Sequence, residues 1–420
     1  MKLSFVCQWF PPEPAPIPLW IAKALQRRVG DVRVLTGIPN YPTGTVADGY
    51  RASRTSRETV EGLPVRRTPL YPSHDNSALG RMANYSSWAV SATLFGQRDL
   101  RGADVALVYS SPATAALPAL WARRRHGTPF VLLVQDLWPD SVLTTGFLTN
   151  RMARRLVGAC LDRFVSWSYN RAAHIAVISP GMTELLVKRG VPRSKISLVY
   201  NWAGEGFMPQ PANSRLRDRL SLGSEGLLLM YAGNHGAAQA LDVPIRAMSR
   251  LDADVNAHLV LVGDGVEKPR LVELARRVAP GRIHFLEPVP AADMPHLMAG
   301  ADVQLVSLRD EPLFRHTMPS KVQTILASGL PLMVVAPGDA GAVPVEAQAG
   351  WSVSPGDEEG LASAVIAAAR TTKAQREQLG ANARAWYLAT MDEQVNGDRL
   401  VRVLAEVAAG QAIDEGSGRR

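Results

Sequence analysis

The chain has 420 residues, which is too long for one ordinary domain, so two domains of about 200 residues are expected. Apolar residues make up 46% and charged residues 20%, as is ordinary for a soluble globular protein. Only Cys7 and Cys160 are present, which argues against a disulfide framework and fits a reducing cytoplasm. The apolar start is too short for a signal peptide, and no run approaches the ~18 apolar residues of a membrane span. The formal charge of +8 indicates an anionic partner: a nucleotide, a lipid phosphate, an anionic membrane or a nucleic acid.

Short apolar runs alternate with longer amphipathic runs in the first 200 residues. This alternation predicts repeated β-α-β units, and therefore a parallel sheet with helices on both faces. The predicted strands are 3–7, 32–36, 105–109, 130–134, 175–179 and 197–200, and the predicted helices are 20–30, 113–126, 152–172 and 182–190.

A hinge or linker is expected at 201–225, where the composition changes and a short exposed helix is predicted at 213–222. The β-α-β pattern then resumes, with strands at 227–232, 257–262, 283–285, 303–307, 332–336 and 351–354. The fold class predicted is α/β, with two Rossmann-like doubly wound domains facing a central cleft. Two domains are expected, at 1–200 and 226–385. A C-terminal helix at 386–408 is expected to pack back on the first domain, and a disordered tail is expected at 409–420. One long helix is predicted over 374–404.

Residues 318–331 form the most informative segment of the chain. Pro319 suits a helix start, Ser320 can cap the helix, and Gly329 can take the left-handed conformation that ends it. Lys321 adds a positive charge where the first-turn amides point outward. The segment predicts a phosphate site at the edge of a parallel sheet.

Two glycine turns follow predicted strands of the second half. Tyr231–Gly236 contains Gly233, Asn234 and Gly236 and leads into a helix with Gln239, and Gly263-Asp264-Gly265 follows another strand. Glycines there let backbone amides approach a ligand. A plain turn explains 231–236 equally well on its own. For 263–265 alone a plain tight turn is the favoured explanation, because the segment lacks the spacing of a dinucleotide fingerprint.

The first half offers a candidate strand-end carboxylate, Asp136, next to Trp138 and Asp140. Asp136 is predicted to be functional, against the alternative of an arginine pair, and Asp140 is predicted to cap a helix. Residues 36–44, which include Asn40 and Tyr41, form a stiff aromatic loop that lines a cleft or is simply a turn.

The eight histidines show no metal-ligand spacing, so no metal site is expected. The arginine clusters at 123–125 and 151–155 lack the interleaved aromatics of single-strand nucleic-acid binding, and no nucleic-acid partner is expected. Residues 84–97 carry no charge and include Tyr85, Trp88, Leu94 and Phe95. A buried core helix is the more frequent explanation of such a segment, and a dip into a membrane interface is the alternative.

Taken together, these motifs resemble the family 4 retaining glycosyltransferases of the GT-B fold. The pattern is most similar to the bacterial capsule, O-antigen and colanic-acid branch, and it covers nearly the whole chain in order. Its motifs stand at 36–44, 136–141, 201–202, 231–236, 263–265 and 319–321.

The resemblance implies transfer of a sugar, with retention, from a nucleotide-diphosphate sugar, UDP more than GDP, without metal or cofactor. The acceptor would be a lipid-diphosphate-linked sugar or a growing polysaccharide. A cytoplasmic enzyme with peripheral membrane contact is therefore expected. By the same resemblance, Asp136 and Lys321 are assigned to catalysis, and Asn40, Tyr41 and Trp138 to the acceptor. The donor would be held by Gly233, Asn234, Gly236, Gln239, Gly263, Asp264, Gly265, Leu286, Arg315, Pro319, Ser320, Lys321 and Thr324.

The chain also departs from the wider family. Asn234 and Gln239 stand where that family has Arg and Lys, Thr324 and His316 stand where it has two glutamates, and Gln135 replaces a histidine. Lys321 and Arg315 would then supply more of the positive field. Two alternatives stay open: a nucleotide-sugar 2-epimerase, which needs no acceptor, and a degenerate nucleotide-sugar-binding scaffold.

Overall fold

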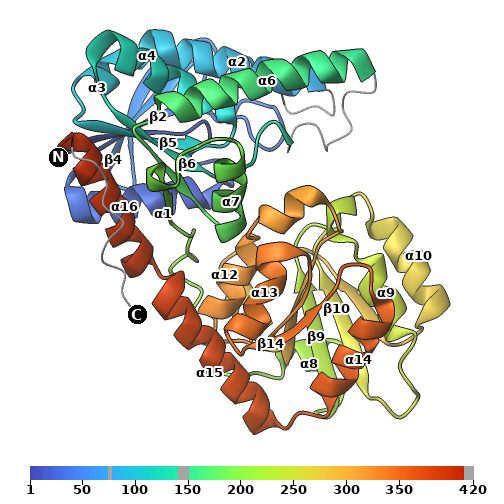
Figure 1. Ribbon diagram of the computed structural model, residues 1–420. Coiled ribbons are helices and arrows are strands. Elements are labelled where there is room, and N and C mark those ends of the chain that lie inside the picture. The colour runs from blue at the N-terminus through green and yellow to red at the C-terminus, as the bar shows by residue number, and fades with distance from the viewer. Residues whose placement is uncertain (74–77, 141–150, 411–420) are drawn as a thin grey trace. The chain divides into compact units, whose positions relative to one another are not determined.

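The computed structural model describes residues 1–73, 78–140 and 151–410. The chain divides into two compact units, one of residues 1–200 with 396–420 and one of residues 201–395. Each unit is built on a mainly parallel sheet covered by helices, as the alternating pattern predicts (Figure 1). Among the described residues, none of the helices combines the length and the apolarity that crossing a bilayer requires.

The described residues of unit 1 form an eight-stranded sheet in the order β3-β4-β2-β1-β5-β6-β7-β8. Among these eight strands only β3 and β4 pair antiparallel. This edge hairpin was not predicted, because its strands alternate polar and apolar residues and contain no long apolar run. The strands are β1 (Lys2–Val6), β2 (Asp31–Gly37), β3 (Ser56–Val60), β4 (Leu63–Thr68), β5 (Val105–Ser110), β6 (Phe130–Val134), β7 (His174–Val177) and β8 (Ile196–Leu198).

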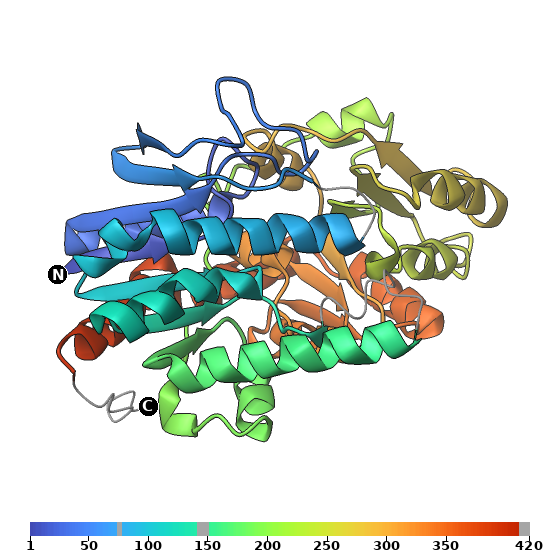
Figure 2. The same ribbon diagram turned by 90° about the horizontal axis from the view of Figure 1, so that it is seen from above.

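Strands β5, β6 and β7 are buried along their whole length, which is typical of parallel strands covered on both faces. Helices lie on both sides of the sheet (Figures 1 and 2). They are α1 (Pro16–Val29), α2 (Ala78–Phe95), α3 (Gln97–Arg101), η1 (Ala113–Ala115), α4 (Ala116–His126), α6 (Arg151–Arg171), α7 (Pro180–Lys188), η2 (Arg193–Lys195) and α16 (Glu393–Ala408).

Unit 2 has six parallel strands in the order β11-β10-β9-β12-β13-β14. They are β9 (Leu227–Ala232), β10 (Ala257–Val262), β11 (Ile283–Leu286), β12 (Val303–Ser307), β13 (Leu332–Val335) and β14 (Gly350–Val353). The helices are α8 (Arg215–Arg219), η3 (Ala237–Gln239), α9 (Asp242–Met248), α10 (Lys268–Val278), α11 (Met294–Met298), η4 (Pro312–His316), α12 (Ser320–Ala327), α13 (Gly338–Glu346), α14 (Glu358–Ala369) and α15 (Lys373–Thr390).

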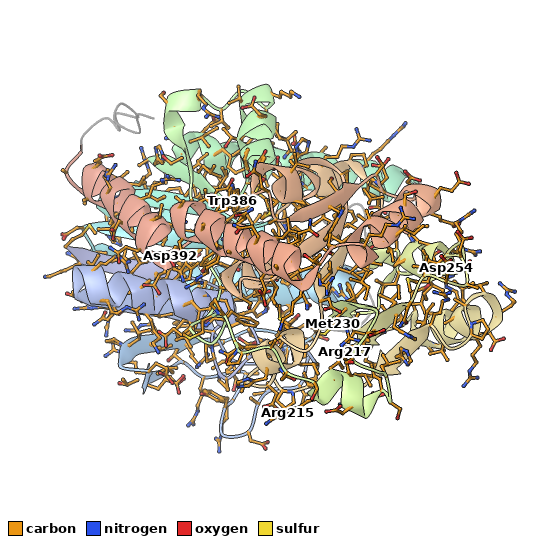
Figure 3. The ribbon with its side chains drawn as sticks, turned by 90° about the horizontal axis from the view of Figure 1, so that it is seen from below. Arg215, Arg217, Met230, Asp254, Trp386 and Asp392 are labelled. Atoms are coloured by element: carbon orange, nitrogen blue, oxygen red, sulfur yellow. The ribbon has the colours of Figure 1, made fainter. Side chains whose placement is uncertain are left out.

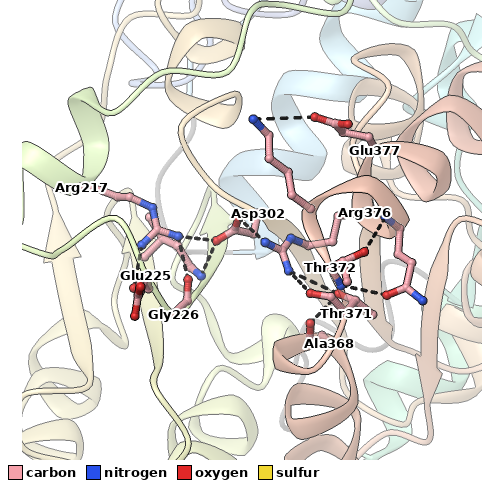
Figure 4. Close-up of polar contacts among 12 residues, drawn as sticks. Arg217, Glu225, Gly226, Asp302, Ala368, Thr371, Thr372, Arg376 and Glu377 are labelled. Carbon is pink, nitrogen blue, oxygen red and sulfur yellow. Dashed lines mark hydrogen bonds and ion pairs between the residues drawn. The ribbon is translucent and has the colours of Figure 1, made fainter.

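The segment predicted as a hinge packs on unit 2. Trp202 is buried, and the backbone N–H of Ala203 donates to the Tyr387 hydroxyl at 3.1 Å. Farther along, the Asp302 carboxylate accepts from Arg217 at 2.5 Å and pairs with Arg376 at 3.5 Å (Figure 4). One carboxylate therefore ties α8 and α15 to the amino end of β12.

The long helix predicted over 374–404 is wrong in one respect, because the chain forms two helices, α15 and α16. The break lies at Met391 and Asp392, and Figure 3 labels Trp386 of α15 and Asp392 of the break. The predicted boundary at residue 385 falls inside α15, whereas the structure divides the chain between Val395 and Asn396. From there α16 packs within unit 1, where Arg399 donates to the Leu198 carbonyl at 2.7 Å and Arg28 pairs with Asp398 at 2.8 Å. The predicted disordered tail lies outside the described residues from 411 onward.

Candidate functional site

In unit 2 two glycine turns lie in contact at the carboxyl ends of β9 and β10. The Gly233 N–H donates to the Val262 carbonyl at 2.9 Å, and the Gly263 N–H donates to the Leu286 carbonyl at 3.0 Å. Gly233 and Gly263 both have positive φ, and a Cβ on Gly263 would lie 2.1 Å from the Gly233 carbonyl oxygen. Glycine is therefore required there for close backbone approach and not only for turning.

The rest of the first turn is held by one hydrogen bond within the turn and its following helix and by another to the second turn. The Gly236 N–H donates to the Gln239 side-chain oxygen at 3.2 Å, and the His235 N–H donates to the Asp264 carbonyl at 2.8 Å. A Cβ on Gly265 would lie 2.7 Å from the Asn234 side-chain oxygen. The predicted residues Asn234, Gly236, Gln239, Asp264 and Gly265 thus lie together on the two turns.

Lys321 reaches these turns from the first turn of α12. Its ammonium donates a hydrogen bond to the Tyr231 hydroxyl and lies 3.8 Å from the centroid of the Tyr231 ring. The Tyr231 hydroxyl in turn donates to the Asn234 carbonyl at 2.7 Å. A Cβ on Gly233 would lie 2.7 Å from the Lys321 nitrogen, so the ammonium lies against this turn in the space that a larger side chain would take.

The environment of Lys321 favours binding of an anion beside its ammonium group. Burial lowers the pKa of Lys321 to about 7. An ammonium held among protein atoms gains more from an incoming anion than an exposed one does, because water screens the pair less. With the first-turn amides of α12 beside it, this is a place for a phosphate.

Details of the α12 start differ from the prediction. The helix begins at Ser320 and its N-cap residue is Pro319, with no side-chain capping bond. The predicted Ser320 cap is therefore wrong, because the proline already sets the entry of the chain and leaves the exposed Ser320 as the first helical residue. Gly329 does take the predicted left-handed conformation, with φ of 64°.

Two predicted donor residues are engaged elsewhere. Arg315 is exposed in η4 and pairs with Asp310 at 3.3 Å. The Thr324 hydroxyl donates to the Lys321 carbonyl at 3.0 Å within its own helix. Leu286, by contrast, joins the site through its backbone carbonyl. Tyr231 and His235 were missed, because Tyr231 lies within an ordinary apolar strand and a single histidine carries no pattern.

In unit 1, Asp136 lies just past the end of β6. Its carboxylate accepts a hydrogen bond from the Ser111 hydroxyl, which follows β5. Its outer surface is open to solvent, but surrounding protein atoms desolvate the carboxyl group and raise its pKa, and the Ser111 bond acts in the opposite direction. A carboxylate with a raised pKa is the stronger base.

Arginine pairing in this region involves Asp140 instead of Asp136. Arg189 pairs with Asp140 and also donates to the Trp138 carbonyl at 3.1 Å. The helix that Asp140 was predicted to cap lies outside the described residues.

A row of aromatic rings crosses the same edge of unit 1. The ring centroids of Trp138 and Tyr85 are 6.0 Å apart, those of Tyr85 and Trp9 are 6.0 Å apart, and those of Trp9 and Tyr41 are 5.3 Å apart. All but Trp138 are partly exposed. The row joins the loops that follow β1, β2 and β6 and includes the predicted Tyr41 and Trp138.

Asn40, predicted to contact the acceptor, is buried and has both ends of its amide occupied. Its nitrogen donates to the Ile38 carbonyl at 3.0 Å, and its oxygen accepts from Asn84 at 2.9 Å. The Gln8 side-chain nitrogen extends this series of hydrogen bonds by donating to the Asn84 side-chain oxygen at 2.6 Å. The described contacts of Asn40 therefore brace the loop.

Glu13 is the buried carboxyl group behind the aromatic row, and sequence reasoning missed it. It accepts from the backbone N–H groups of Asn40 and Tyr41 at 2.9 Å each and of Phe10 at 3.0 Å. Burial raises its pKa to about 7, against the effect of these amides and of Arg67. It joins the loops after β1 and β2.

Replacing Glu13 with glutamine is expected to destabilise the protein by about 1–3 kcal/mol, because an amide NH₂ would face a backbone N–H that needs an acceptor. The raised pKa means that the folded state binds a proton more tightly than the unfolded state between pH 4.5 and about 7. The contribution of Glu13 to the free energy of unfolding therefore falls as the pH rises through that window. The difference in stability between wild type and E13Q should accordingly be largest near pH 4.5.

Urea unfolding across that pH window measures this difference. The control is Glu61→Gln, whose carboxylate pairs with Lys23 at 3.3 Å and is 55% exposed, and it should change stability by less than about 0.5 kcal/mol. An E13Q protein as stable as wild type at every pH would show that the carboxyl group does not brace these loops.

Among the described residues, no group of three or more His, Cys, Asp or Glu side chains is arranged to hold a metal ion.

Comparison with known proteins gives matches over both units. Residues 14–202 match the model of a glycosyl transferase 4-like domain, and residues 226–371 match the model of glycosyl transferases group 1. WcaI of Escherichia coli (strain K12), named as a glycosyl transferase of colanic acid biosynthesis, is 29% identical over 310 residues, which cover 71% of this chain and 74% of WcaI. WbjE of Pseudomonas aeruginosa, named as a glycosyltransferase, is 28% identical over 268 residues, covering 62% and 65% of the two chains.

Among solved structures, HepE of Anabaena in complex with UDP matches with a TM-score of 0.69 and 16% identity, over 97% of this chain and 100% of HepE. At this identity the likeness shows the two-unit fold. The first matched segment covers unit 1 from after β1 through β8, and the second covers every strand of unit 2.

Proposed function

Because the chain belongs to the family 4 glycosyltransferases of the GT-B fold, we propose that it transfers a sugar from a nucleotide-diphosphate sugar to an acceptor hydroxyl with retained configuration. The contact of Lys321 with the glycine turn at Gly233 is the observation that carries this proposal. A largely buried ammonium group, backbone amides and a helix N-terminus lie close together there. Such a group of donors can stabilise the negative charge of a diphosphate leaving group.

On the donor side, Lys321 neutralises the diphosphate, and the backbone of Gly233 to Gly236 approaches it. Gly263, Asp264 and Gly265, together with the backbone at Leu286, border the ribose and base. Pro319 and Ser320 present the first amides of α12. The exposed Arg315 and the Thr324 hydroxyl would have to leave their present partners to take part. UDP is the favoured nucleotide, and the UDP complex of the structurally similar HepE supports this choice.

On the acceptor side, Asp136 accepts a hydrogen bond from the reacting hydroxyl and takes up its proton. Tyr41 and Trp138, with Trp9 and Tyr85 between them, offer aromatic faces to a sugar, and Asn40 holds the loop behind them. The name of WcaI, from colanic acid biosynthesis, supports a role in polysaccharide synthesis. We propose a lipid-linked sugar or a growing polysaccharide of the cell surface as the acceptor. A cytoplasmic enzyme in peripheral contact with the membrane follows from such an acceptor.

A thermal-shift screen against UDP, GDP, ADP and dTDP, without metal, tests the donor site. One nucleotide at about 100 times its Kd should stabilise the protein by about 2.7 kcal/mol, a rise of several degrees. Absence of a rise with all four, in protein that unfolds cooperatively, would contradict the nucleotide-sugar proposal and favour a degenerate scaffold.

We expect turnover to be independent of metal ions, since the ammonium and backbone donors supply the positive field. Release of nucleoside diphosphate from the donor identified above should be unchanged, within about twofold, by EDTA. Loss of activity in EDTA that Mg²⁺ or Mn²⁺ restores would contradict this.

Tyr231→Phe is expected to weaken binding of that nucleoside diphosphate by roughly tenfold. Lys321 loses the acceptor that holds it beneath the turn, and the Asn234 carbonyl loses its donor. Titration calorimetry measures the affinity. The matched control is Tyr387→Phe, which removes a buried hydroxyl bonded to the Ala203 N–H elsewhere in unit 2. The control should lose stability without losing affinity; equal affinity losses would remove Tyr231 from the site.

A further inference from the structure

Three helices of unit 1, α2, α4 and α6, lie side by side over one face of its sheet (Figures 1 and 2). They carry large apolar side chains that are 43–68% exposed. We call this surface the three-helix face. Its exposed apolar residues are Val90, Leu94 and Phe95 of α2, Trp121 of α4, and Leu156 and Trp167 of α6.

These side chains are not the edge of a buried core. Trp88 and Ala92 of α2 are fully buried against the sheet, whereas Leu94 of the same helix is 67% exposed. On α4, Trp121 is 51% exposed although its neighbours Leu120 and Ala122 are buried. The uncharged segment 84–97 therefore has a buried side, as the core-helix interpretation predicts, and a separate exposed apolar side. An apolar surface spread over three adjacent helices is typical of an interaction site.

The segments that form the three helices are strongly basic. Residues 78–126 and 151–171, which contain the three helices, carry eleven arginines, no lysine and three aspartates. Their net charge equals the +8 of the whole chain. Arg98, Arg124, Arg125, Arg155 and Arg163 are exposed, and one of the aspartates, Asp99, is already paired with Arg66. Exposed arginines therefore accompany the exposed apolar residues on these segments.

We propose that the three-helix face docks on the anionic surface of a phospholipid bilayer. Tryptophan, phenylalanine and leucine side chains enter the headgroup region, and the arginines contact lipid phosphates. A second copy of the chain fits less well, because a two-fold interface would place one strongly positive face against another. The inference rests on the proposed function, since a lipid-linked acceptor requires the enzyme to work at a membrane.

Vesicle sedimentation of the full chain tests this docking. The probes are vesicles of phosphatidylcholine alone and of phosphatidylcholine with about one third phosphatidylglycerol. Wild type should bind the anionic vesicles at least tenfold more tightly than the neutral ones, and added salt should weaken that binding. Leu94→Gln with Trp121→Gln, and separately Arg124→Gln with Arg125→Gln, should each weaken it about tenfold or more.

The matched control is Val345→Gln with Leu388→Gln, two exposed apolar residues of unit 2, which should bind anionic vesicles like wild type. The proposal would be overturned if wild type did not bind anionic vesicles at low salt. It would also be overturned if the control lost as much affinity as the Leu94/Trp121 variant. A dimer that only the Leu94/Trp121 variant dissociates would do the same and assign the face to a second copy.

The nucleotide thermal shift of every variant should equal that of wild type, which shows that each one folds. The same measurement separates the two proposals. A wild type that binds anionic vesicles but no nucleoside diphosphate would contradict the proposed function while leaving the membrane face in place.

Discussion

Replacing Lys321 with methionine is expected to lower transfer by about a thousandfold or more while leaving the fold intact. The ammonium is the charged side chain in contact with the Gly233 turn, and methionine keeps most of its apolar stem. Loss of a preorganised charge from a leaving-group site costs on the order of two to four kcal/mol in the transition state, and the lost donor binding adds to this. Donor turnover and nucleotide affinity measure the two parts.

The stability of the same variant distinguishes a binding role from a structural one. Burial lowers the pKa of Lys321 to about 7, so between that pH and 10.5 the unfolded chain holds more protons than the folded chain. Wild type therefore gains stability as pH rises through this window, and at lower pH it carries the full cost of the buried charge. K321M should lack the gain and should unfold no more easily than wild type near neutral pH.

The pH dependence of binding has the opposite direction. Only the ammonium form attracts a diphosphate, so wild-type affinity should weaken as pH rises above about 7, by up to about tenfold per pH unit. K321M supplies the baseline, because any dependence it retains belongs to the nucleotide. An active K321M, or one that unfolds near neutral pH, would remove Lys321 from the diphosphate site.

The two sheets were predictable because parallel strands buried on both faces appear as continuous apolar runs. Strands β6, β9, β10 and β12 have the bounds that their sequences predict. The hairpin of β3 and β4 was missed for the converse reason. Its residues alternate at an exposed edge, and Arg66 and Arg67 lie within a strand.

The candidate site was predictable only where backbone geometry leaves a sequence signal. Glycines at 233 and 263 mark close approach, and both are found there. Side-chain partnerships leave no such signal: Glu13 joins loops 27 residues apart, and Tyr231 meets Lys321 across 90 residues. For the same reason the sequence could not show that Asn40 faces inward, because its amide partners come from α2 and from its own loop.

Replacing Asp136 with asparagine is expected to lower transfer at least a hundredfold while nucleotide affinity stays within about twofold of wild type. Asparagine keeps the size of the side chain and an oxygen to accept the Ser111 hydrogen bond, but it cannot take up a proton. Because Asp136 belongs to unit 1 and the glycine turns belong to unit 2, the two measurements report on separate parts of the chain.

The pH profile strengthens this test, because partial dehydration raises the pKa of Asp136. Wild-type turnover should fall on the acid side as the carboxylate takes up a proton, and D136N should lose that limb along with most of its rate. Asp140→Asn is the matched control, since its carboxylate pairs with Arg189 and has no assigned chemistry. If D136N and D140N reduced turnover equally, the Asp136 carboxylate would have a structural role. Another group would then have to accept the proton of the acceptor hydroxyl.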